Sequence, residues 1–443
     1  MVNVHEVFST SITLDEIEKA DRDSTSVDEA ASECQRICHA GTLLPLKHEH
    51  FHHVFIPFSP MLCAFYAGPK CSSGESGETC IYVVRIEADG SHSSVQKLDC
   101  PELNQSKNCT PVLFYLNQGV EMRERRFKEG LSHNRCVKGD ITTSIDRLMD
   151  DVQNATPGTR ISAADDAVIA LVYKAGPLNE TPRSYLSVSC DDGKSFVTPR
   201  KAVEGGDVKI RGPVRTKPFL FRKGPFAGRV LFPSSVESNA GPAFVDYTDD
   251  DLRTVNTSNS IDPSAVQVEA SEKSFVAKGV IQAALFEDLG VHQADDNDLQ
   301  QLTEDEYEAK SCVVHMLMSA ACSQMHVADS YDAGASFGEP YPIELYNCLA
   351  GVDCVTYMNR LLVCGKLTTD PEKAKTKEDS PLSIYMSKDG VHFEELLRLE
   401  DDPKGTYTSP YMQVDRRHHL LYVAYTDHRK AIKIRIFRML VTK

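Results

Sequence analysis

The stretch Ser-Cys-Asp-Asp-Gly-Lys-Ser-Phe at residues 189–196 decides the fold, because it recurs as Ser-Tyr-Asp-Ala-Gly-Ala-Ser-Phe at residues 330–337. Both copies share the pattern Ser-x-Asp-x-Gly-x-Ser-Phe. The Ser hydroxyl and the Asp carboxylate can hydrogen-bond to their own turn, and Gly supplies a residue with positive φ. The terminal aromatic ring can then pack between neighbouring sheets. A repeated turn of this kind indicates a repeat architecture before it indicates any function.

Weaker copies of the turn occur at residues 87–90, 248–251 and 387–393, the last being one residue short. Copies that start at 189, 248, 330 and 387 are separated by 59, 82 and 57 residues. The long interval holds an acidic segment at about residues 288–310, and a polar segment at about 117–165 precedes the first strong copy. Without these two insertions, the period is that of one four-stranded propeller blade.

Short apolar segments bounded by turn residues lie between the copies, which favours an all-β fold. We predict six four-stranded blades over residues 38–443, preceded by an N-terminal extension at residues 1–37 in which residues 25–36 form a helix. The last apolar segment alternates isoleucines with Lys433 and Arg435, a pattern expected of an outer blade strand.

Composition restricts the partners. The 443 residues include 64 acidic and 48 basic side chains, which gives a net charge of −16. This balance disfavours nucleic acids and anionic membranes as partners. No apolar run is long enough to span a bilayer, and residues 1–25 lack the apolar core of a signal peptide. We therefore expect a cytoplasmic protein whose fourteen cysteines are free thiols.

The repeated turn is the Asp box, or BNR repeat, and the chain resembles the sialidase superfamily along nearly its whole length. The similar segments are Cys38–Thr42, Pro111–Phe114, Gly212–Pro218, Pro233–Glu237, Gly279–Gln282, Pro381–Leu382 and Tyr425–Arg429. The resemblance implies a six-bladed β-propeller in which the Asp boxes are structural. Their key residues are Ser189, Asp191, Gly193, Phe196, Ser330, Asp332, Gly334, Phe337, Ser387, Asp389, Gly390 and Phe393.

Sialidases hold the carboxylate of their sugar with three arginines, because guanidinium groups bind carboxylates bidentately and stay charged. The resemblance places these arginines at Cys38–Ala40, at Met318 and at Asp379–Ser380, and none of these positions holds an arginine. Each lost contact to a buried charge costs a few kcal/mol. We therefore expect no binding of sialic acid.

Sialidases also use a tyrosine nucleophile that a glutamate activates. The glutamate position falls at Gln282, which cannot act as a base, and the tyrosine position falls near Ser409, between Tyr407 and Tyr411. The resemblance therefore predicts that sialidase catalysis has been lost.

Several polar residues remain at positions that the family directs toward the central pocket. Glu78 (or Glu75) and Glu237 are the candidate catalytic acid and base for a glycosidic bond. The candidate ligand-binding residues are His39, Arg215, Lys217, Gln282, Tyr407, Tyr411 and Arg429. The structural alternative is that these charges pair with one another and close the central funnel.

The histidine-rich segment 48–53 could project alternate side chains from one face of a strand, but no further ligand spacing supports a metal site. This segment and residues 416–419 are better interpreted as hairpin tips. The cysteine spacings do not match structural zinc sites. We predict neither a metal nor a cofactor.

We therefore predict a sialidase-like propeller that binds a glycan or a protein partner; its oligomeric state is undetermined. One alternative is an exo-acting glycoside hydrolase that cleaves a non-sialic sugar with Glu78 and Glu237. Another is a structural subunit that makes contacts through residues 1–37 and 288–310. An enzyme of this kind would carry two carboxylates about 5–10 Å apart in an open pocket. A binding module would have aromatic or Arg/Lys walls instead.

Overall fold

The computed structural model describes residues 2–24, 36–46, 58–69, 78–98, 106–116, 168–177, 183–202, 216–221, 224–235, 242–249, 252, 255–261, 282–289, 312–319, 323–347, 351–375, 380–402 and 404–441. The insertion predicted at 117–165 lies outside these residues, as do residues 290–310 of the insertion predicted at 288–310 and residues 25–35 of the helix predicted at 25–36, whose last residue, Arg36, instead begins a strand. In the described part, strands dominate and are joined by two helices, α1 (Leu14–Ser24) and α5 (Pro371–Lys375).

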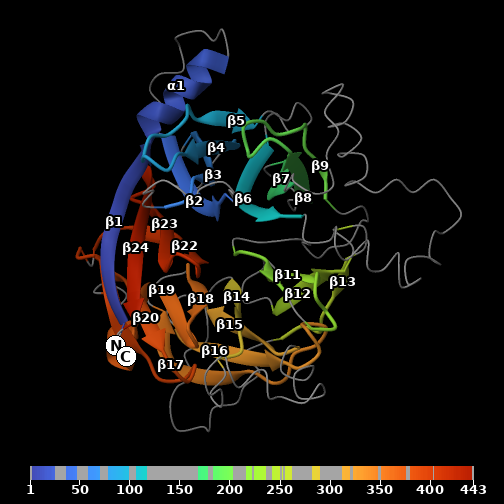
Figure 1. Cartoon of the computed structure of the whole chain (residues 1–443), viewed down its shortest axis with the longest axis vertical. Helices are drawn as coiled ribbons and strands as arrows, with labels where there is room; N and C mark the ends of the chain where they lie inside the picture. The colour runs from blue at the N-terminus through green and yellow to red at the C-terminus, as the bar shows by residue number, and fades with distance from the viewer. Residues whose placement is uncertain are drawn as a thin grey trace, which may run out of the picture.

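The described strands pair into five antiparallel sheets around a common centre (Figure 1). Sheet 1 contains β2 (Arg36–Pro45), β3 (Met61–Pro69), β4 (Cys80–Ile86) and β5 (Gln96–Leu98). Sheet 2 contains β6 (Ser106–Tyr115), β7 (Ile169–Pro177), β8 (Arg183–Ser189) and β9 (Arg200–Lys201). Sheet 3 contains β10 (Phe219–Leu220), β11 (Val230–Ser235), β12 (Ala243–Thr248) and β13 (Asn256–Thr257).

Sheet 4 has eight strands in two groups. Sheet 4a contains β14 (Gln282–Glu287), β15 (Val314–Ser319), β16 (Ser323–Ser330) and β17 (Tyr341–Asn347). Sheet 4b contains β18 (Asp353–Tyr357), β19 (Arg360–Thr368), β20 (Leu382–Ser387) and β21 (Glu394–Glu400). In the described residues, strand pairing between the two groups occurs where Tyr346 and Asn347 pair with Thr368 and Leu367. Sheet 5 contains β22 (Tyr407–Asp415), β23 (Leu420–Asp427), β24 (Ala431–Val441) and β1 (Val2–Thr13).

Apolar side chains fill the space between neighbouring sheets. Separate buried clusters lie between sheets 1 and 2, 2 and 3, 3 and 4a, 4a and 4b, 4b and 5, and 5 and 1. In sheets 1, 2, 4a, 4b and 5 the first strand lies innermost, since β2 contacts β6 and β22, and β18 contacts β14 and β22. Sheet 5 therefore packs back onto sheet 1, and the predicted all-β, propeller-like arrangement is confirmed.

The N-terminus completes the last sheet, which differs from the prediction. Residues 2–13 were assigned to an extension, but they form β1, which pairs with β24 along its length. The edge strand of sheet 5 is therefore β1, and β24 is not the outer strand that its alternating pattern suggested. Strand order depends on which segment pairs with β24, and the alternating pattern of β24 carries no information about that partner.

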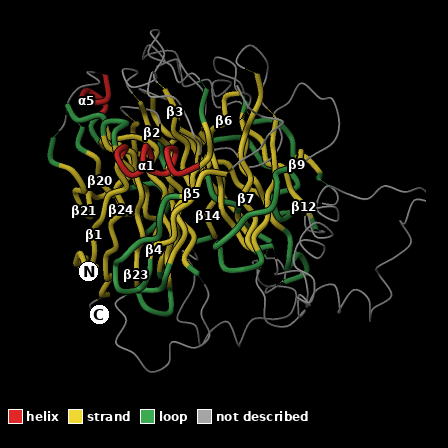
Figure 2. The backbone as a smooth tube through the Cα atoms, turned by 90° about the horizontal axis from the view of Figure 1, so that it is seen from above, coloured by secondary structure: helices red, strands yellow, loops and turns green. Residues whose placement is uncertain are grey.

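Helix α1 follows β1 and contacts β1, β2 and β5 at the rim of the strand layer (Figure 2). Its start is marked by a capping box, because Glu16 accepts hydrogen bonds from the Thr13 N–H at 2.7 Å and from the Thr13 hydroxyl at 3.0 Å. Ile17 is fully buried between the helix and the sheets. The prediction missed this helix, although Thr13-Leu14-Asp15-Glu16 is a readable start signal. None of the helices in the described residues is long and apolar enough to cross a membrane.

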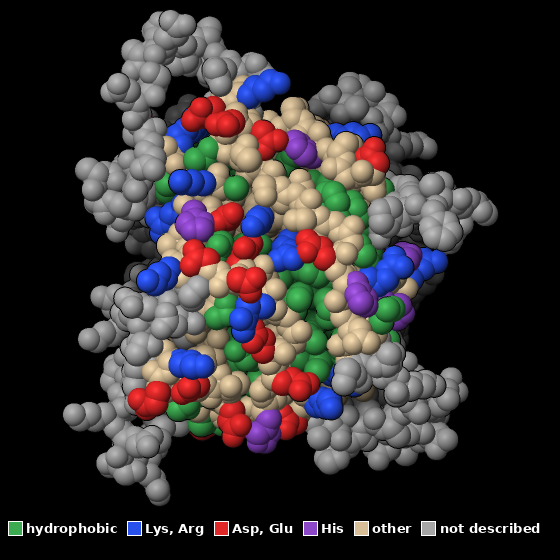
Figure 3. Space-filling model, turned by 90° about the vertical axis from the view of Figure 1, so that its left-hand side faces the viewer, with side chains coloured by type: hydrophobic (Ala, Val, Ile, Leu, Met, Phe, Trp, Pro, Cys, Tyr) green, Lys and Arg blue, Asp and Glu red, His purple; other side chains and the backbone are tan. Residues whose placement is uncertain are grey.

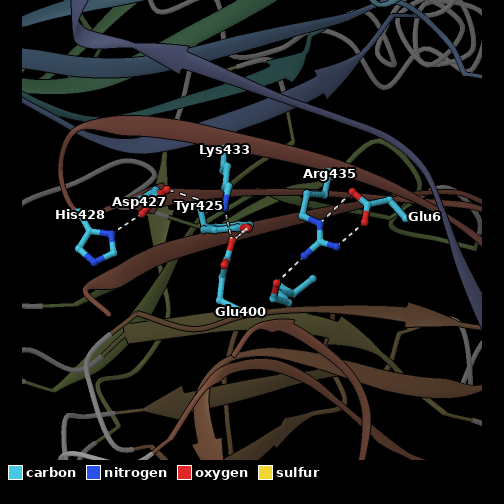
Figure 4. A network of polar contacts seen from close by, with 8 residues as sticks. Glu6, Glu400, Tyr425, Asp427, His428, Lys433 and Arg435 are labelled. Atoms are coloured by element: carbon cyan, nitrogen blue, oxygen red, sulfur yellow. Dashed lines mark hydrogen bonds and ion pairs between the residues drawn. The ribbon is translucent and has the colours of Figure 1, made fainter. Parts of the chain in front are cut away.

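Charged side chains also hold β1 in place. Acidic and basic side chains are interspersed over the face that carries sheet 5 (Figure 3). Arg435 forms a two-pronged ion pair with Glu6, with Nε 3.1 Å from Oε1, and also donates to the Leu399 carbonyl of sheet 4b (Figure 4). Lys433 lies 2.5 Å from Glu400, whose carboxylate also accepts the Tyr425 hydroxyl. This network joins β1, β24 and the neighbouring sheet.

The two strong Asp boxes form nearly identical turns. Ser189 Oγ donates to Asp191 at 2.8 Å and accepts from the Gly193 N–H at 2.9 Å. The corresponding distances for Ser330, Asp332 and Gly334 are 2.9 and 2.8 Å. Both glycines have positive φ, 78° and 80°, as the turn requires.

The third box is shorter by one residue and forms the same turn more tightly. Ser387 donates to Asp389 at 3.0 Å and accepts from the Gly390 N–H at 2.8 Å. The aromatic residues that end the boxes, Phe196, Phe337 and Phe393, pack into three different clusters between sheets, as the pattern predicts.

Two arginines bind the Asp boxes of the next sheet. Arg85 of sheet 1 donates to the Asp192 carbonyl at 2.9 Å, and Arg229 of sheet 3 donates to the Ala333 carbonyl at 3.2 Å. Each arginine also pairs with a carboxylate of its own sheet, Glu87 or Asp249. The boxes thus serve as contact points between sheets.

Candidate functional site

The inner strands share a backbone irregularity near the axis. In β2, β6 and β22 the register shifts between His39 and Thr42, between Cys109 and Val112, and between Thr408 and Tyr411. Within these bulges Ala40, Thr110 and Ser409 have φ of 56°, 52° and 49°. Positive φ is unfavourable for residues with a Cβ, so the surrounding packing must enforce it. The bulges turn backbone toward the centre of the ring.

His39 connects sheet 1 to sheet 5. Its Nδ1 lies 2.9 Å from Thr426 Oγ1, and its Nε2 lies 3.3 Å from Ser409 Oγ. The Thr426 hydroxyl oxygen also accepts the Ala40 N–H at 3.0 Å, and the His39 ring packs edge-on against Tyr66. Within Cys38–Ala40, where the resemblance predicts the first arginine, this chain therefore has a histidine engaged by neighbouring hydroxyls.

Other sheets are joined in the same way. Gln282 Oε1 accepts the Val352 N–H at 3.0 Å, which connects sheets 4a and 4b. The Thr216 hydroxyl donates to the Ala283 carbonyl at 2.8 Å, and Asn108 N–H donates to Thr79 Oγ1 at 2.8 Å. Near the axis, these polar side chains make hydrogen bonds between sheets.

Lys217 and Asp353 form a buried ion pair at the axis. Lys217 Nζ lies 2.7 Å from both carboxylate oxygens, and the Met412 N–H donates to Asp353 Oδ2 at 2.6 Å. Only 1% of the Asp353 side chain is exposed, against 15% for Lys217. Burial raises the pKa of the Asp353 carboxyl, and the Lys217 ammonium and the Met412 N–H oppose that rise. The pair connects sheets 3, 4b and 5.

The space along the axis of the ring is narrow at the bulges. The space bounded by Ala40, Gly41, Thr42, Pro111, Gln282, Val352, Ser409 and Pro410 has a volume of about 10 Å³. That volume is roughly the space needed by one water molecule. A sugar therefore does not fit at this constriction.

A much larger cavity, of about 730 Å³, lies at the C-terminal ends of the inner strands. Aromatic rings on its wall come from Tyr115, Phe219 and Phe286, and aliphatic side chains include Leu44 and Leu285. A volume of several hundred Å³ with mixed apolar and polar walls is typical of a ligand site. Lys217 reaches this cavity and is the predicted ligand-binding residue that the described lining includes.

Several charged side chains on the described cavity wall are paired. Arg416 NH2 lies 2.6 Å from Glu287 and donates to the Thr356 carbonyl at 3.1 Å. His418 Nδ1 lies 2.6 Å from Asp415. Residues 416–419 form the turn between β22 and β23, as the hairpin interpretation predicted, and no sequence pattern indicated that residues 416–418 border a cavity.

The remaining predicted residues lie elsewhere. Tyr411 is 1% exposed, within the core between sheets 5 and 1, and its hydroxyl accepts from Gln413 at 3.3 Å. Tyr407 packs edge-on against Tyr425 and His428. Burial raises the pKa of both Tyr411 and Tyr407, which opposes a nucleophilic role at neutral pH. Arg429 is exposed in the turn after β23, where its carbonyl accepts the Cys38 N–H.

The catalytic prediction stays a prediction. Glu78 is exposed immediately before β4, while Glu75, Glu237 and Arg215 lie outside the described residues. The histidine-rich segment 48–53 also lies outside them. In the described part of the chain, no group of three or more His, Cys, Asp or Glu side chains is placed to hold a metal ion.

Sequence prediction missed Asp353. The readable signal is a single acidic residue inside the apolar run from Val352 to Val355, because a charge in a buried strand needs a partner. The partner, Lys217, is 136 residues away, and no local pattern connects the two residues.

The sequence profile of the BNR repeat-like domain matches residues 140–421. This chain belongs to that family. The fold is similar to a protein of unknown function from Dyadobacter fermentans, with 13% identity, 99% of each chain covered and a TM-score of 0.55.

It is also similar to Trypanosoma rangeli sialidase in complex with the inhibitor DANA, with 12% identity and a TM-score of 0.52, over 98% of this chain and 60% of that one. The K499G mutant of NanB sialidase from Streptococcus pneumoniae matches with 8% identity and a TM-score of 0.50, over 95% and 72% of the two chains. At these identities the likeness shows a shared sialidase-like fold and nothing further. No curated protein matches the sequence.

Proposed function

We propose that this protein is a carbohydrate-binding β-propeller that has lost sialidase catalysis, and that its ligand occupies the cavity of about 730 Å³. The observation that carries the proposal is the wall of this cavity, where the partly exposed rings of Tyr115 and Phe219 lie among fixed hydrogen-bonding groups. Aromatic surfaces with a few oriented polar groups suit sugars, whose faces are apolar and whose edges carry hydroxyls.

Loss of sialidase catalysis is supported at the axis. His39 and Gln282 occupy positions where the resemblance expects an arginine and a glutamate, and both are engaged in hydrogen bonds between sheets. On the described wall of the cavity, the carboxylates Glu287 and Asp415 are each engaged by a neighbouring arginine or histidine.

We also infer that the propeller has six blades, with sheets 4a and 4b as separate blades joined by a two-residue contact. Each is a four-stranded group with its own inner strand, and a separate apolar cluster lies between the two. An experimental structure would test this count.

The proposed function is tested by two measurements on the purified protein: binding to a glycan array, and turnover of aryl glycosides that include sialosides. We expect glycan binding without turnover. Turnover of a non-sialic glycoside that is lost in a Glu78→Gln, Glu237→Gln double variant would replace the proposal with the hydrolase hypothesis. Sialoside turnover would show that the positions assigned to the three sialidase arginines are wrong. If the protein shows no glycan binding and no turnover, the structural-subunit hypothesis replaces the proposal.

A further inference from the structure

The charged side chains described on and directly behind the cavity wall balance one another. The described wall carries three cations, Lys217, Arg416 and Arg417, and two carboxylates, Glu287 and Asp415. A third carboxylate, Asp353, lies directly behind Lys217 and contacts it at 2.7 Å. Three positive charges therefore meet three negative ones, and His418 adds a charge only when protonated.

Pairing also fixes the direction of these groups. Glu287 and Arg416 hold each other at 2.6 Å, and Asp415 accepts the backbone N–H groups of Arg417 and His418 at 3.0 and 3.1 Å. The wall consequently presents both donors and acceptors in set positions. Thr356, Gln413 and Ser59 supply further uncharged polar groups on the same wall.

Such a wall discriminates by charge. An anionic ligand would give up its hydration and find no net positive charge in return, which makes its transfer costly. A hydroxyl both donates and accepts, so it can satisfy either member of a charge pair without leaving the other unpaired. The rings of Tyr115 and Phe219, which are partly exposed, offer apolar surface to the faces of a sugar ring, whereas Phe286 is only 4% exposed.

We propose that the cavity binds a neutral sugar and rejects its acidic counterpart, with the balance of the Lys217, Arg416 and Glu287 charges setting this selectivity. The proposal rests on the carbohydrate-binding function and adds the class of sugar. It also separates the protein from the sialidases that it resembles, because sialic acid is an acidic sugar.

The test compares matched sugars by isothermal titration calorimetry. Methyl glucoside and methyl glucuronide, and the corresponding galactose pair, differ only in a hydroxymethyl group against a carboxylate. For the wild-type protein we expect the affinity for the better-bound neutral sugar to be about tenfold or more above the affinity for its acidic partner. Its affinity should change by less than about twofold between about 0.02 M and about 0.5 M salt, because no ionic contact to the ligand is screened.

Glu287→Gln tests the role of the charge balance. This variant leaves the cations in excess by one, so the affinity for the acidic sugar should rise relative to the neutral one by about threefold or more. Glu395→Gln removes the same charge from an exposed ion pair with Arg398 on β21, and should leave the ratio unchanged. A Phe219→Ala variant, checked for folding by circular dichroism, should weaken neutral-sugar binding, whereas Tyr331→Ala, at a ring that is 73% exposed in an Asp box, should not.

The outcomes separate the two proposals. An acidic sugar that binds as tightly as its neutral partner, or a selectivity ratio that Glu287→Gln leaves unchanged, overturns the neutral-sugar inference and leaves carbohydrate binding intact. If Phe219→Ala and Tyr331→Ala affect sugar binding equally, the ligand lies outside the cavity and the inference is overturned. Absence of binding by every sugar on the array and in the calorimeter overturns the proposed function and the inference with it.

Discussion

Replacing Lys217 with methionine should destabilise the protein strongly, because the variant leaves a buried carboxylate without its cation. In the native structure the Asp353 carboxylate receives Lys217 Nζ at 2.7 Å on each oxygen and the Met412 N–H at 2.6 Å, with 1% of its side chain exposed. Breaking a buried pair from one side costs about 3–5 kcal/mol. Methionine keeps most of the lysine's apolar volume, so the loss reports the charge.

The penalty should depend on pH. Burial already raises the pKa of Asp353 above its ordinary value of 3.8, and loss of the ammonium raises it further. A carboxyl whose pKa is raised by folding is tolerated when protonated and costs stability as the pH rises through the folded pKa. The difference between Lys217→Met and the wild type should therefore be larger at about pH 8 than at about pH 5.

Equilibrium urea unfolding, followed by far-ultraviolet circular dichroism, measures the effect; the chain has no tryptophan to follow by fluorescence. Asp353→Asn in the Lys217→Met background should recover part of the loss, since it removes the unpaired charge. Arg416→Met is the exposed control: its pair with Glu287 is 49% and 43% exposed, so its loss should cost about 0–1 kcal/mol. A loss below about 1 kcal/mol for Lys217→Met, or a double variant as unstable as the sum of the single variants, would refute the reasoning.

Three further predictions follow from other parts of the fold. His315 lies 2.7 Å from Asp329 and 3.6 Å from Asp288; burial alone would lower its pKa, but the two carboxylates raise it to about 9 from an ordinary 6.5. His315→Gln should therefore lower the free energy of unfolding by about 3 kcal/mol below about pH 6.5, and this loss should fade as the pH rises through about 9. A loss of stability that does not depend on pH in urea titrations would contradict this prediction. Gly334→Ala places a Cβ 2.5 Å from a Leu231 methyl at φ +80°, and should lower the free energy of unfolding by about 1–3 kcal/mol. In the control Gly338→Ala, the Cβ meets nothing closer than 3.7 Å, so the free energy of unfolding should change by less than about 0.5 kcal/mol. Equal melting temperatures for the two variants would count against the packing argument. Deleting residues 1–13 removes β1 and exposes the edge of β24, so size-exclusion chromatography should show aggregation, and a soluble, monomeric protein with native circular dichroism would show that β1 is dispensable.

Prediction succeeded where the signal is local. The turns at 189–196 and 330–337 hold because every hydrogen bond they need comes from residues within the same short stretch, such as Ser189 to Asp191. Thr13 and Glu16 mark the start of α1 equally locally, and that signal was overlooked rather than absent. The candidate site was harder, since His39 is held by residues 370 and 387 positions away, and no periodic pattern records such contacts.

By itself, the sequence determined the all-β, repeated architecture and the position of the Asp boxes. These features depend on residue identity and on spacing within one turn or strand. Tertiary structure alone decided that the N-terminal segment completes the last sheet, that Lys217 pairs with Asp353 across the axis, and that the cavity lies at the far ends of the inner strands from His39. Each of these depends on which sheets become neighbours when the ring closes, and that is settled by the packing of the whole chain.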